Sequence, residues 1–296
     1  MPWLWAVFTV AASGGQVLRN AMQRELTATL GTVGATHVRF LFGLPFALLS
    51  LLIVLAANRT SLPEITVPVM AWTVAASIAQ IAATALLLAV MQLRSFVVTT
   101  AYVKTEPVQV AIFGMLFLGD HVTPGLALAI LIATAGVLIV SWPRGDTAEA
   151  FSWKPTALGL AAAALFAIAA VGYRGGIRAL EAPNFVVAAT TVLALGLLIQ
   201  TIMLTAYLTL ADRATLAAIF RAWRPSLFAG FMGAFASQMW FLAFALETAA
   251  KVRTLALVEI LFAQVVSRNL FKQKLASREA VGIALIIAGV VLLLNN

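Results

Sequence analysis

The sequence predicts an all-α polytopic membrane protein with ten transmembrane helices, arranged as two inverted five-helix repeats. Three observations lead to this fold class: an apolar composition, a series of apolar segments of membrane-spanning length, and a similarity between the two halves of the chain. Of the 296 residues, 62% are hydrophobic and only 10% are charged, whereas about a quarter of the residues in a soluble domain are charged. We therefore expect lipid to surround most of the protein.

The apolar segments account for the ten expected helices. A helix needs about 20 mostly apolar residues to cross a bilayer core, where the backbone must satisfy its own hydrogen bonds. Two segments, 95–119 and 254–271, have the right length but contain charges. The others contain none and cover residues 1–18, 40–57, 65–93, 125–142, 156–173, 184–211, 226–246 and 280–294. The first of these has no basic region ahead of it, so we expect a retained helix rather than a signal peptide.

The charge and the cysteine content narrow the class of protein further. The formal net charge of +8 comes from Lys and Arg residues that lie mostly near the ends of the apolar segments, where such residues contact lipid headgroups. We therefore expect the lipid bilayer as a partner and no nucleic acid. The absence of cysteine excludes disulfides and thiolate metal sites. The expected location is the plasma membrane, which is the inner membrane in a bacterium, with a multi-pass topology.

The two halves align when the chain is shifted by 153 positions, which places Glu106 on Glu259. A shared glutamate inside a membrane span is informative because ionisable groups there are costly and rare. We expect the repeats to cover residues 1–145 and 146–296. Five spans per repeat is an odd number, so the second repeat enters the membrane from the opposite side. Such inverted repeats are typical of transporters that bind their substrate between the halves.

Motifs at the end of the first repeat carry a family resemblance. Residues 102–142 contain, in order, Glu106-Pro107, Gly119-Asp120 and Gly136-Val137-Leu138. This pattern resembles the end of a repeat in the drug/metabolite transporter superfamily, EamA-type branch. The second half is similar but diverged, with Ile260 in place of the proline and Lys272-Gln273 in place of the Gly-acidic pair.

The resemblance implies a ten-helix secondary transporter or facilitator that exports amino acids or related small metabolites by alternating access. Some relatives, the YddG-type exporters, favour aromatic and other amino acids, which makes an aromatic amino acid the leading expectation on family grounds. A proton-coupled drug or metabolite antiporter is an alternative. Members of the family are usually drawn with both termini in the cytoplasm, whereas Lys and Arg are more frequent in the connections after odd-numbered spans, which favours the opposite orientation.

Charged residues within the spans are the first candidates for function. Lys104 and Glu106 are two residues apart and point to nearly opposite sides of a helix, so each must find its partner elsewhere. One hypothesis places Glu106 and Glu259 beside the central pathway, where they could exchange protons. The alternative is that both glutamates are ion-paired or hydrogen-bonded within the helix bundle, with Lys104 as one partner. Pro107 cannot donate the helical hydrogen bond to the carbonyl of Val103, so we expect a kink there.

Polar and aromatic side chains at helical spacing complete the candidate site. Stripes in spans one, three and four would line a cavity, although buried polar residues also hold helices together. Aromatic residues in spans six and eight could contact an apolar or aromatic solute. The candidate substrate-binding residues are Gln16, Asn20, Ser77, Gln80, Thr84, Thr99, Tyr102, Glu106, Tyr173, Ser237, Trp240 and Glu259.

The sequence contains no recognised catalytic or nucleotide-binding motif, so we expect no enzyme activity, no cofactor and no metal site. An intramembrane enzyme acting on a lipid-linked substrate is the alternative from another class. Small residues at intervals of four in the last helix of each half predict packing faces, which would join the halves or form an oligomer contact. In the first case the protein could be a monomer. The two ladders are Gly125, Ala129 and Ala133, and Ala280, Ala284 and Ala288.

Overall fold

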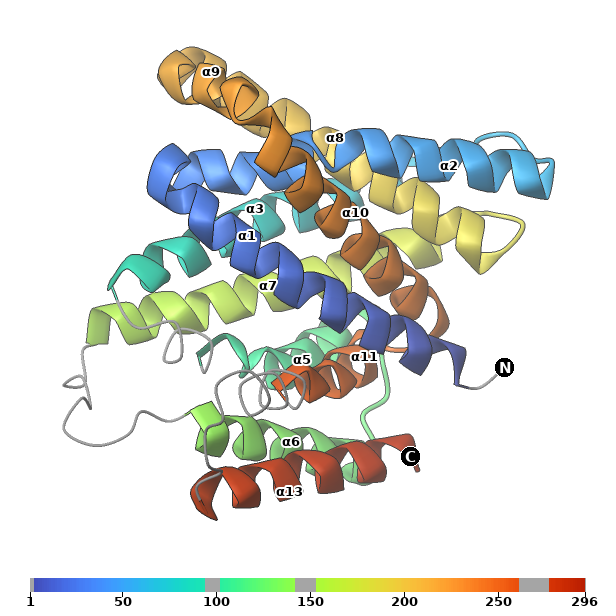
Figure 1. Cartoon of the computed structure of the whole chain (residues 1–296). Coiled ribbons are helices and arrows are strands. Elements are labelled where there is room, and N and C mark those ends of the chain that lie inside the picture. The colour runs from blue at the N-terminus through green and yellow to red at the C-terminus, as the bar shows by residue number, and fades with distance from the viewer. Residues whose placement is uncertain (1–2, 94–101, 142–152, 261–276, 296) are drawn as a thin grey trace.

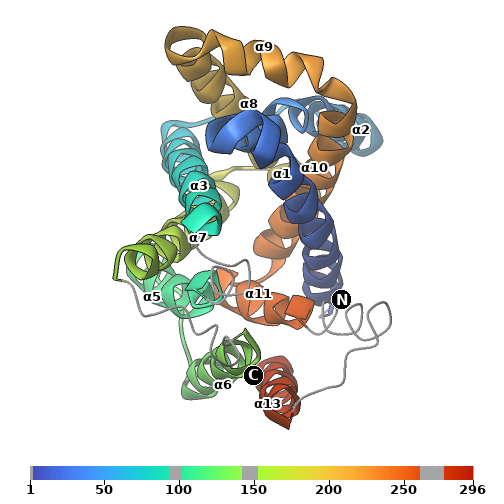
Figure 2. The same cartoon turned by 60° about the vertical axis from the view of Figure 1, so that its left-hand side comes forward.

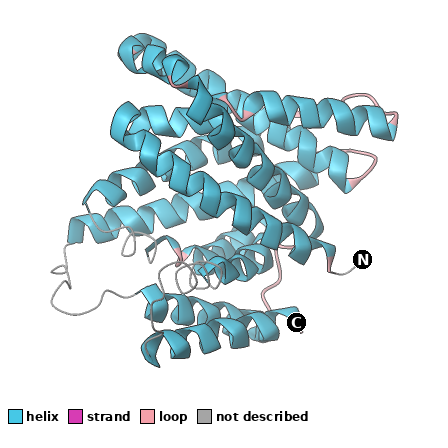
Figure 3. Cartoon of the chain, in the orientation of Figure 1, coloured by secondary structure: helices cyan, strands magenta, loops and turns pink. Residues whose placement is uncertain are grey.

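The computed structural model describes residues 3–93, 102–141, 153–260 and 277–295. The described part of the chain consists of helices and connecting loops (Figure 3). The helices are α1 (Leu4–Leu41), α2 (Leu44–Asn58), α3 (Val67–Leu93), α5 (Glu106–Leu118), α6 (Pro124–Ser141), α7 (Trp153–Ala179), α8 (Phe185–Ala211), α9 (Arg213–Arg221), α10 (Trp223–Leu246), α11 (Ala249–Leu255), the 3-10 turn η2 (Ala256–Val258) and α13 (Ser277–Leu294).

Six helical segments among the described residues are long and apolar enough to cross a membrane. They are Glu25–Asn58, Val67–Met91, Pro124–Ser141, Trp153–Ala179, Phe185–Ala211 and Trp223–Leu246. Two shorter apolar helices, Glu106–Leu118 and Ala280–Leu294, add to them. The expectation of an all-helical, multi-pass membrane protein is therefore confirmed, whereas much of the ninth expected span lies outside the described residues.

The first two expected spans are longer than the apolar segments that predicted them. Helical structure continues through residues 19–39, and several polar side chains of this stretch are buried inside the protein: Arg19 is 5% and Arg39 4% exposed. Gly31 interrupts α1 with φ 67° and ψ 179°, a conformation that is essentially restricted to glycine. The chain therefore turns at Gly31 and returns into the protein as a second helical segment.

The last helices of the two halves pack closely against each other. α6 and α13 begin at residues 124 and 277 and end at residues 141 and 294, so both bounds differ by 153 positions. The two helices lie side by side and run in opposite directions (Figure 1). Gly136, Gly282 and Gly289 allow this approach, since a Cβ on Gly289 would lie 2.7 Å from the backbone nitrogen of Ala133.

The alanine ladder of the last helix does not form its contact with α6. In α6, Ala129 and Ala133 are buried against α13, as expected. In α13, by contrast, the Ala280, Ala284 and Ala288 ladder is exposed. The face toward α6 is formed by Gly282, Ile286 and Gly289, because glycine permits a closer approach of backbones than alanine does.

Two short elements lie between the α6–α13 pair and the remaining helices. Figures 1 and 2 show α5 and α11 in this position, below α1, α3, α7 and α10. α5 packs against α7 and α11, and α11 also contacts α1 and α6. Glu106 of α5 and Arg253 of α11 both line the cavity in the middle of the protein.

A short helix that the sequence analysis did not anticipate, α9, connects α8 to α10. Asp212 caps its first turn by accepting hydrogen bonds from the backbone nitrogen and the hydroxyl of Thr215, at 3.0 and 2.6 Å. These hydrogen bonds lower the pKa of the Asp212 carboxyl. One face of α9 buries Ile219 while Phe220 on another is exposed, which is typical of a helix that lies along a membrane interface.

Candidate functional site

A cavity of about 160 Å³ lies between helices from both halves of the chain. It is comparable in size with the ~150 Å³ cavity known to hold benzene, so it accommodates a small molecule. Its polar and charged lining consists of Gln16, Arg19, Asn20, Arg39, Gln80, Lys104, Glu106, Tyr173, Ser237, Arg253 and Glu259. Apolar and aromatic residues, among them Trp240, Phe241 and Phe244, complete the wall.

Eight of the twelve candidate residues line this cavity, namely Gln16, Asn20, Gln80, Glu106, Tyr173, Ser237, Trp240 and Glu259. Ser77 lies behind the wall, where its hydroxyl is 3.2 Å from the Tyr173 hydroxyl. Thr84 borders a smaller adjoining cavity and accepts a 3.5 Å hydrogen bond from Arg39. Tyr102 instead bonds Thr156 at 2.9 Å, away from the cavity. Thr99 lies outside the described residues.

Two ion pairs cross between the halves at the floor of the cavity. Lys104 of the first half pairs with Glu259 of the second, and Arg253 of the second half lies 3.1 Å from Glu106 of the first. All four side chains are largely buried, with relative exposures of 10–12%. Both glutamates are therefore ion-paired inside the helix bundle, one of them with Lys104. This is the second of the two arrangements considered from the sequence.

The ion pairs do not use all the hydrogen-bonding capacity of their members. Within the described chain, Glu106 Oε1, Arg253 Nε and Glu259 Oε2 are buried and have no hydrogen-bond partner. The Glu106–Arg253 contact is thus an ion pair rather than a hydrogen bond. Because polar groups are normally hydrogen-bonded when buried, the charged floor of the cavity is less fully satisfied than an ordinary protein interior.

Broken helices position the two glutamates. Tyr102 and Val103 are helical, Lys104 and Thr105 form a turn, and α5 then begins at Glu106. Pro107 stands in the first turn of α5, where its missing N–H costs no helical hydrogen bond. The expected kink therefore takes the form of a helix start. In the second half, η2 interrupts the helix directly before Glu259.

Aromatic rings and amide groups form one wall of the cavity. The guanidinium of Arg253 lies over the rings of Trp240 and Phe244, at 4.4 and 5.4 Å. The Trp240 indole donates a 3.2 Å hydrogen bond to Gln16. Tyr173 packs on Phe241 with ring centroids 4.7 Å apart. These contacts fix the orientation of the wall before any ligand binds.

A chain of hydrogen bonds holds Tyr173 from behind. Gln200 donates to the Tyr173 hydroxyl and to Gln80 Oε1, both at 2.9 Å. Since Gln80 and Tyr173 both face the cavity, Gln200 couples two lining residues from α3 and α7 through α8.

Three charged residues of the cavity were not among the candidates: Arg19, Arg39 and Arg253. Arg39 and Arg253 each directly precede an expected span in the sequence, and a hydropathy pattern treats any charge there as a boundary between spans. Arg19 carried a usable signal, since it continues the polar stripe that includes Gln16 and Asn20. It donates to Asn20 Oδ1 through Nε and Nη2, at 3.2 and 2.8 Å.

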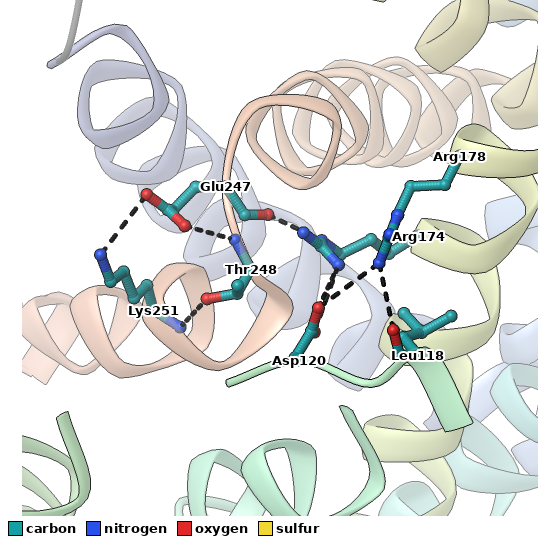
Figure 4. A network of polar contacts seen from close by, with 7 residues as sticks. All are labelled: Leu118, Asp120, Arg174, Arg178, Glu247, Thr248 and Lys251. Carbon is teal, nitrogen blue, oxygen red and sulfur yellow. Dashed lines mark hydrogen bonds and ion pairs between the residues drawn. The ribbon is translucent and has the colours of Figure 1, made fainter. Parts of the chain in front are cut away.

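A second polar network joins the ends of α5, α7 and α10 (Figure 4). Asp120 accepts a 2.8 Å hydrogen bond from Arg174, and Arg178 lies 3.5 Å away. Arg174 also donates to the backbone oxygen of Glu247 at 2.9 Å. Gly119 supplies the left-handed residue, φ 66°, that ends α5, so the Gly119-Asp120 motif turns the chain and connects the first half to the second.

These observations define a polytopic helical membrane protein with a charged central cavity. Residues 153–295 match the model of the EamA-like transporter family, which confirms the family resemblance seen in the sequence. No curated protein matches the sequence. A solved structure titled "Crystal structure of protein" shares the fold, with a TM-score of 0.71 and 14% sequence identity over 98% of this chain and 94% of that one.

Proposed function

We propose that the protein is a secondary transporter or facilitator that exports amino acids, aromatic ones included, or related small metabolites by alternating access. The observation that carries this proposal is the central cavity, which both halves of the chain line and which crossed ion pairs between the halves hold together. The match of the second half to a transporter family supports the same class of function.

The arrangement of helices supports two inverted repeats, residues 1–145 and 146–296, as the moving parts. Besides α6 and α13, the pairs α2 and α8 end at residues 58 and 211, and α3 and α10 at 93 and 246, again 153 positions apart. α1 packs on α10, and α7 on α3. Each repeat therefore contributes a helix to the other's packing, which is the arrangement expected when two inverted units rock around a site.

Alternating access requires contacts between the halves that close one side of the cavity and that break when this side opens. The Asp120–Arg174–Glu247 network meets this requirement, since it joins the two halves at the helix ends near both termini (Figure 1). Two lining residues lie at the other end of the chain segments involved: Met91 near the end of α3 and Val103 just before α5, whereas Asp120 follows the end of α5. We interpret the network as the closed side and the opposite end as the open side.

The test is solute flux with the purified protein as the only protein in the membrane. Proteoliposomes would be given a panel of radiolabelled amino acids, with and without an imposed proton gradient. Flux that follows the solute gradient alone indicates facilitated diffusion, and flux that the proton gradient accelerates indicates antiport. Absence of flux for the whole panel, with protein shown to be folded and inserted, would favour a non-transporting function such as an enzyme acting on a lipid-linked substrate.

A further inference from the structure

Within the part of the chain that the structure describes, two arginines in the cavity have no acidic partner. Arg19 and Arg39 are 5% and 4% exposed and both line the cavity. Among the described residues neither forms an ion pair, and Arg19 Nη1 and Arg39 Nε have no hydrogen-bond partner at all. Their remaining contacts are neutral: Asn20 for Arg19, and Thr84, at 3.5 Å, for Arg39. A buried cation without a counter-ion is strongly unfavourable, so this pair has the composition of an anion site.

The fold brings the two arginines together from either side of the turn at Gly31. Their aliphatic stems meet at Gly233 of α10, where a Cβ would lie 3.5 Å from Arg19 Cδ and 3.4 Å from Arg39 Cγ. Two like charges held side by side repel each other, and a shared anion relieves that repulsion. The forked N–H groups of two guanidinium ions also match the oxygens of a carboxylate or phosphate.

The remaining charges of the cavity do not neutralise this pair. Lys104 and Arg253 are matched by Glu259 and Glu106. The lining thus contains four basic and two acidic residues and a formal surplus of two positive charges. A neutral amino acid brings one carboxylate and one ammonium, which leaves the surplus unchanged. A solute with net negative charge reduces it.

We propose that Arg19 and Arg39 bind a carboxylate or phosphate group of the transported solute, and that this solute is a small organic anion. The inference rests on the proposed transport function and narrows its substrate class; within amino acids it selects the acidic ones. The cavity volume of about 160 Å³ suits a small solute. Any apolar part of it would pack against Trp240 and Phe244.

Binding to the purified full-length protein in detergent tests the anion site without requiring transport. Isothermal titration would compare succinate, L-aspartate and glycerol 3-phosphate with L-leucine. We expect the anions to bind more tightly than L-leucine, and Arg19→Gln or Arg39→Gln to weaken them about ten- to hundred-fold, as expected for lost charge-assisted hydrogen bonds. Arg221→Gln removes an exposed arginine of α9 and should leave binding unchanged. The dicarboxylate and phosphate arms identify which group the pair prefers.

Charge-retaining variants cover the case in which a glutamine variant does not fold. Arg19→Lys and Arg39→Lys keep the positive charge and should keep the preference for anions over L-leucine. Equal binding of succinate and L-leucine by the wild-type protein would overturn the proposal without any variant. Succinate binding that is unchanged in the glutamine variants and in the lysine variants would also overturn the proposal.

Flux measurements separate the failure of this inference from the failure of transport. Flux of L-leucine that exceeds flux of succinate and L-aspartate, and that Arg19→Gln does not change, would overturn the anion proposal and leave the transport function intact. Binding of succinate that depends on Arg19 and Arg39, without flux of any tested solute, would support the anion site and contradict transport. Flux of the anions that both glutamine variants reduce supports both.

Discussion

Glu106 and Glu259 occupy equivalent positions in the two halves of the chain, and each forms an ion pair with a cation that the opposite half contributes. The pairs are therefore crossed, with Lys104 reaching from the first half to Glu259 and Arg253 from the second half to Glu106. Both lie at the floor of the cavity, where breaking a pair by removal of one member leaves an uncompensated buried charge. The crossed pairs thus hold the halves together and set the charge of the cavity.

The first prediction concerns the Lys104–Glu259 pair. Glu259→Gln should destabilise the protein by about 3–5 kcal/mol, because it leaves the Lys104 ammonium buried without a partner. Adding Lys104→Met should recover much of this loss, since both charges are then gone. The measurement is thermal unfolding in detergent of the wild type, the two single variants and the double variant.

The matched control is Glu64→Gln, which neutralises a glutamate that is exposed and should change the unfolding temperature little. A double variant destabilised by the sum of the two single losses would contradict a direct interaction between Lys104 and Glu259, because the energies would then be additive.

The second prediction separates a structural from a proton-coupling role of the glutamates. If Glu106 exchanges protons during transport, Glu106→Gln should abolish the acceleration of flux by a proton gradient while downhill flux persists at a reduced rate. Flux in proteoliposomes at several imposed gradients measures this directly. A variant whose rate still rises with the gradient as steeply as that of the wild type would exclude Glu106 from proton coupling.

The third prediction concerns the Asp120–Arg174 contact as the closed side of the cavity. Asp120→Asn removes a charge-assisted hydrogen bond between the halves, so opening on that side should become more favourable. The equilibrium constant between the closed and the open state should shift toward the open state about tenfold for each 1.4 kcal/mol of interaction energy lost. Because the chain has no cysteine, Ser237→Cys alone reports access to the cavity through labelling by an impermeant maleimide. Labelling should rise in only one of right-side-out and inside-out vesicles.

Arg178→Gln provides the comparison for this experiment. The Arg178 side chain is 53% exposed and lies 3.5 Å from Asp120, and exposed ion pairs contribute little. Its effect on labelling should be much smaller than that of Asp120→Asn. If the two changes raise labelling equally, or if both vesicle orientations respond alike, the network is not the closure.

Much of this architecture could be predicted from the sequence because lipid imposes strong rules. The lengths of the apolar segments predicted a helical, multi-pass membrane protein. The Glu-Pro and Gly-acidic motifs carried the family resemblance. Helical periodicity placed Gln16 and Asn20 on one face of the first helix, and both line the cavity, since side chains on one face of a helix point the same way. These are properties of local sequence, which a pattern can capture.

The missed features depend on distant contacts. Arg39 is charged and lies next to an apolar segment, so its sequence environment is that of a membrane boundary; only the turn at Gly31 directs it back into the protein. Arg253 is likewise buried because Glu106, Trp240 and Phe244 surround it. The choice of packing face in α13 depended on how closely α6 approaches, which no pattern within α13 expresses.

The last prediction follows from that packing face. Gly289→Val should separate α6 from α13, because a Cβ at this position would lie 2.7 Å from the backbone nitrogen and 2.8 Å from the Cβ of Ala133. Overpacking of this kind costs about 1–3 kcal/mol, and it should appear as a lower unfolding temperature in detergent. Ala288→Val, one residue earlier on the exposed face, adds similar bulk without a contact and should be nearly neutral. Should Ala288→Val prove the more harmful of the two, the alanine ladder rather than the glycine face would form the helix contact.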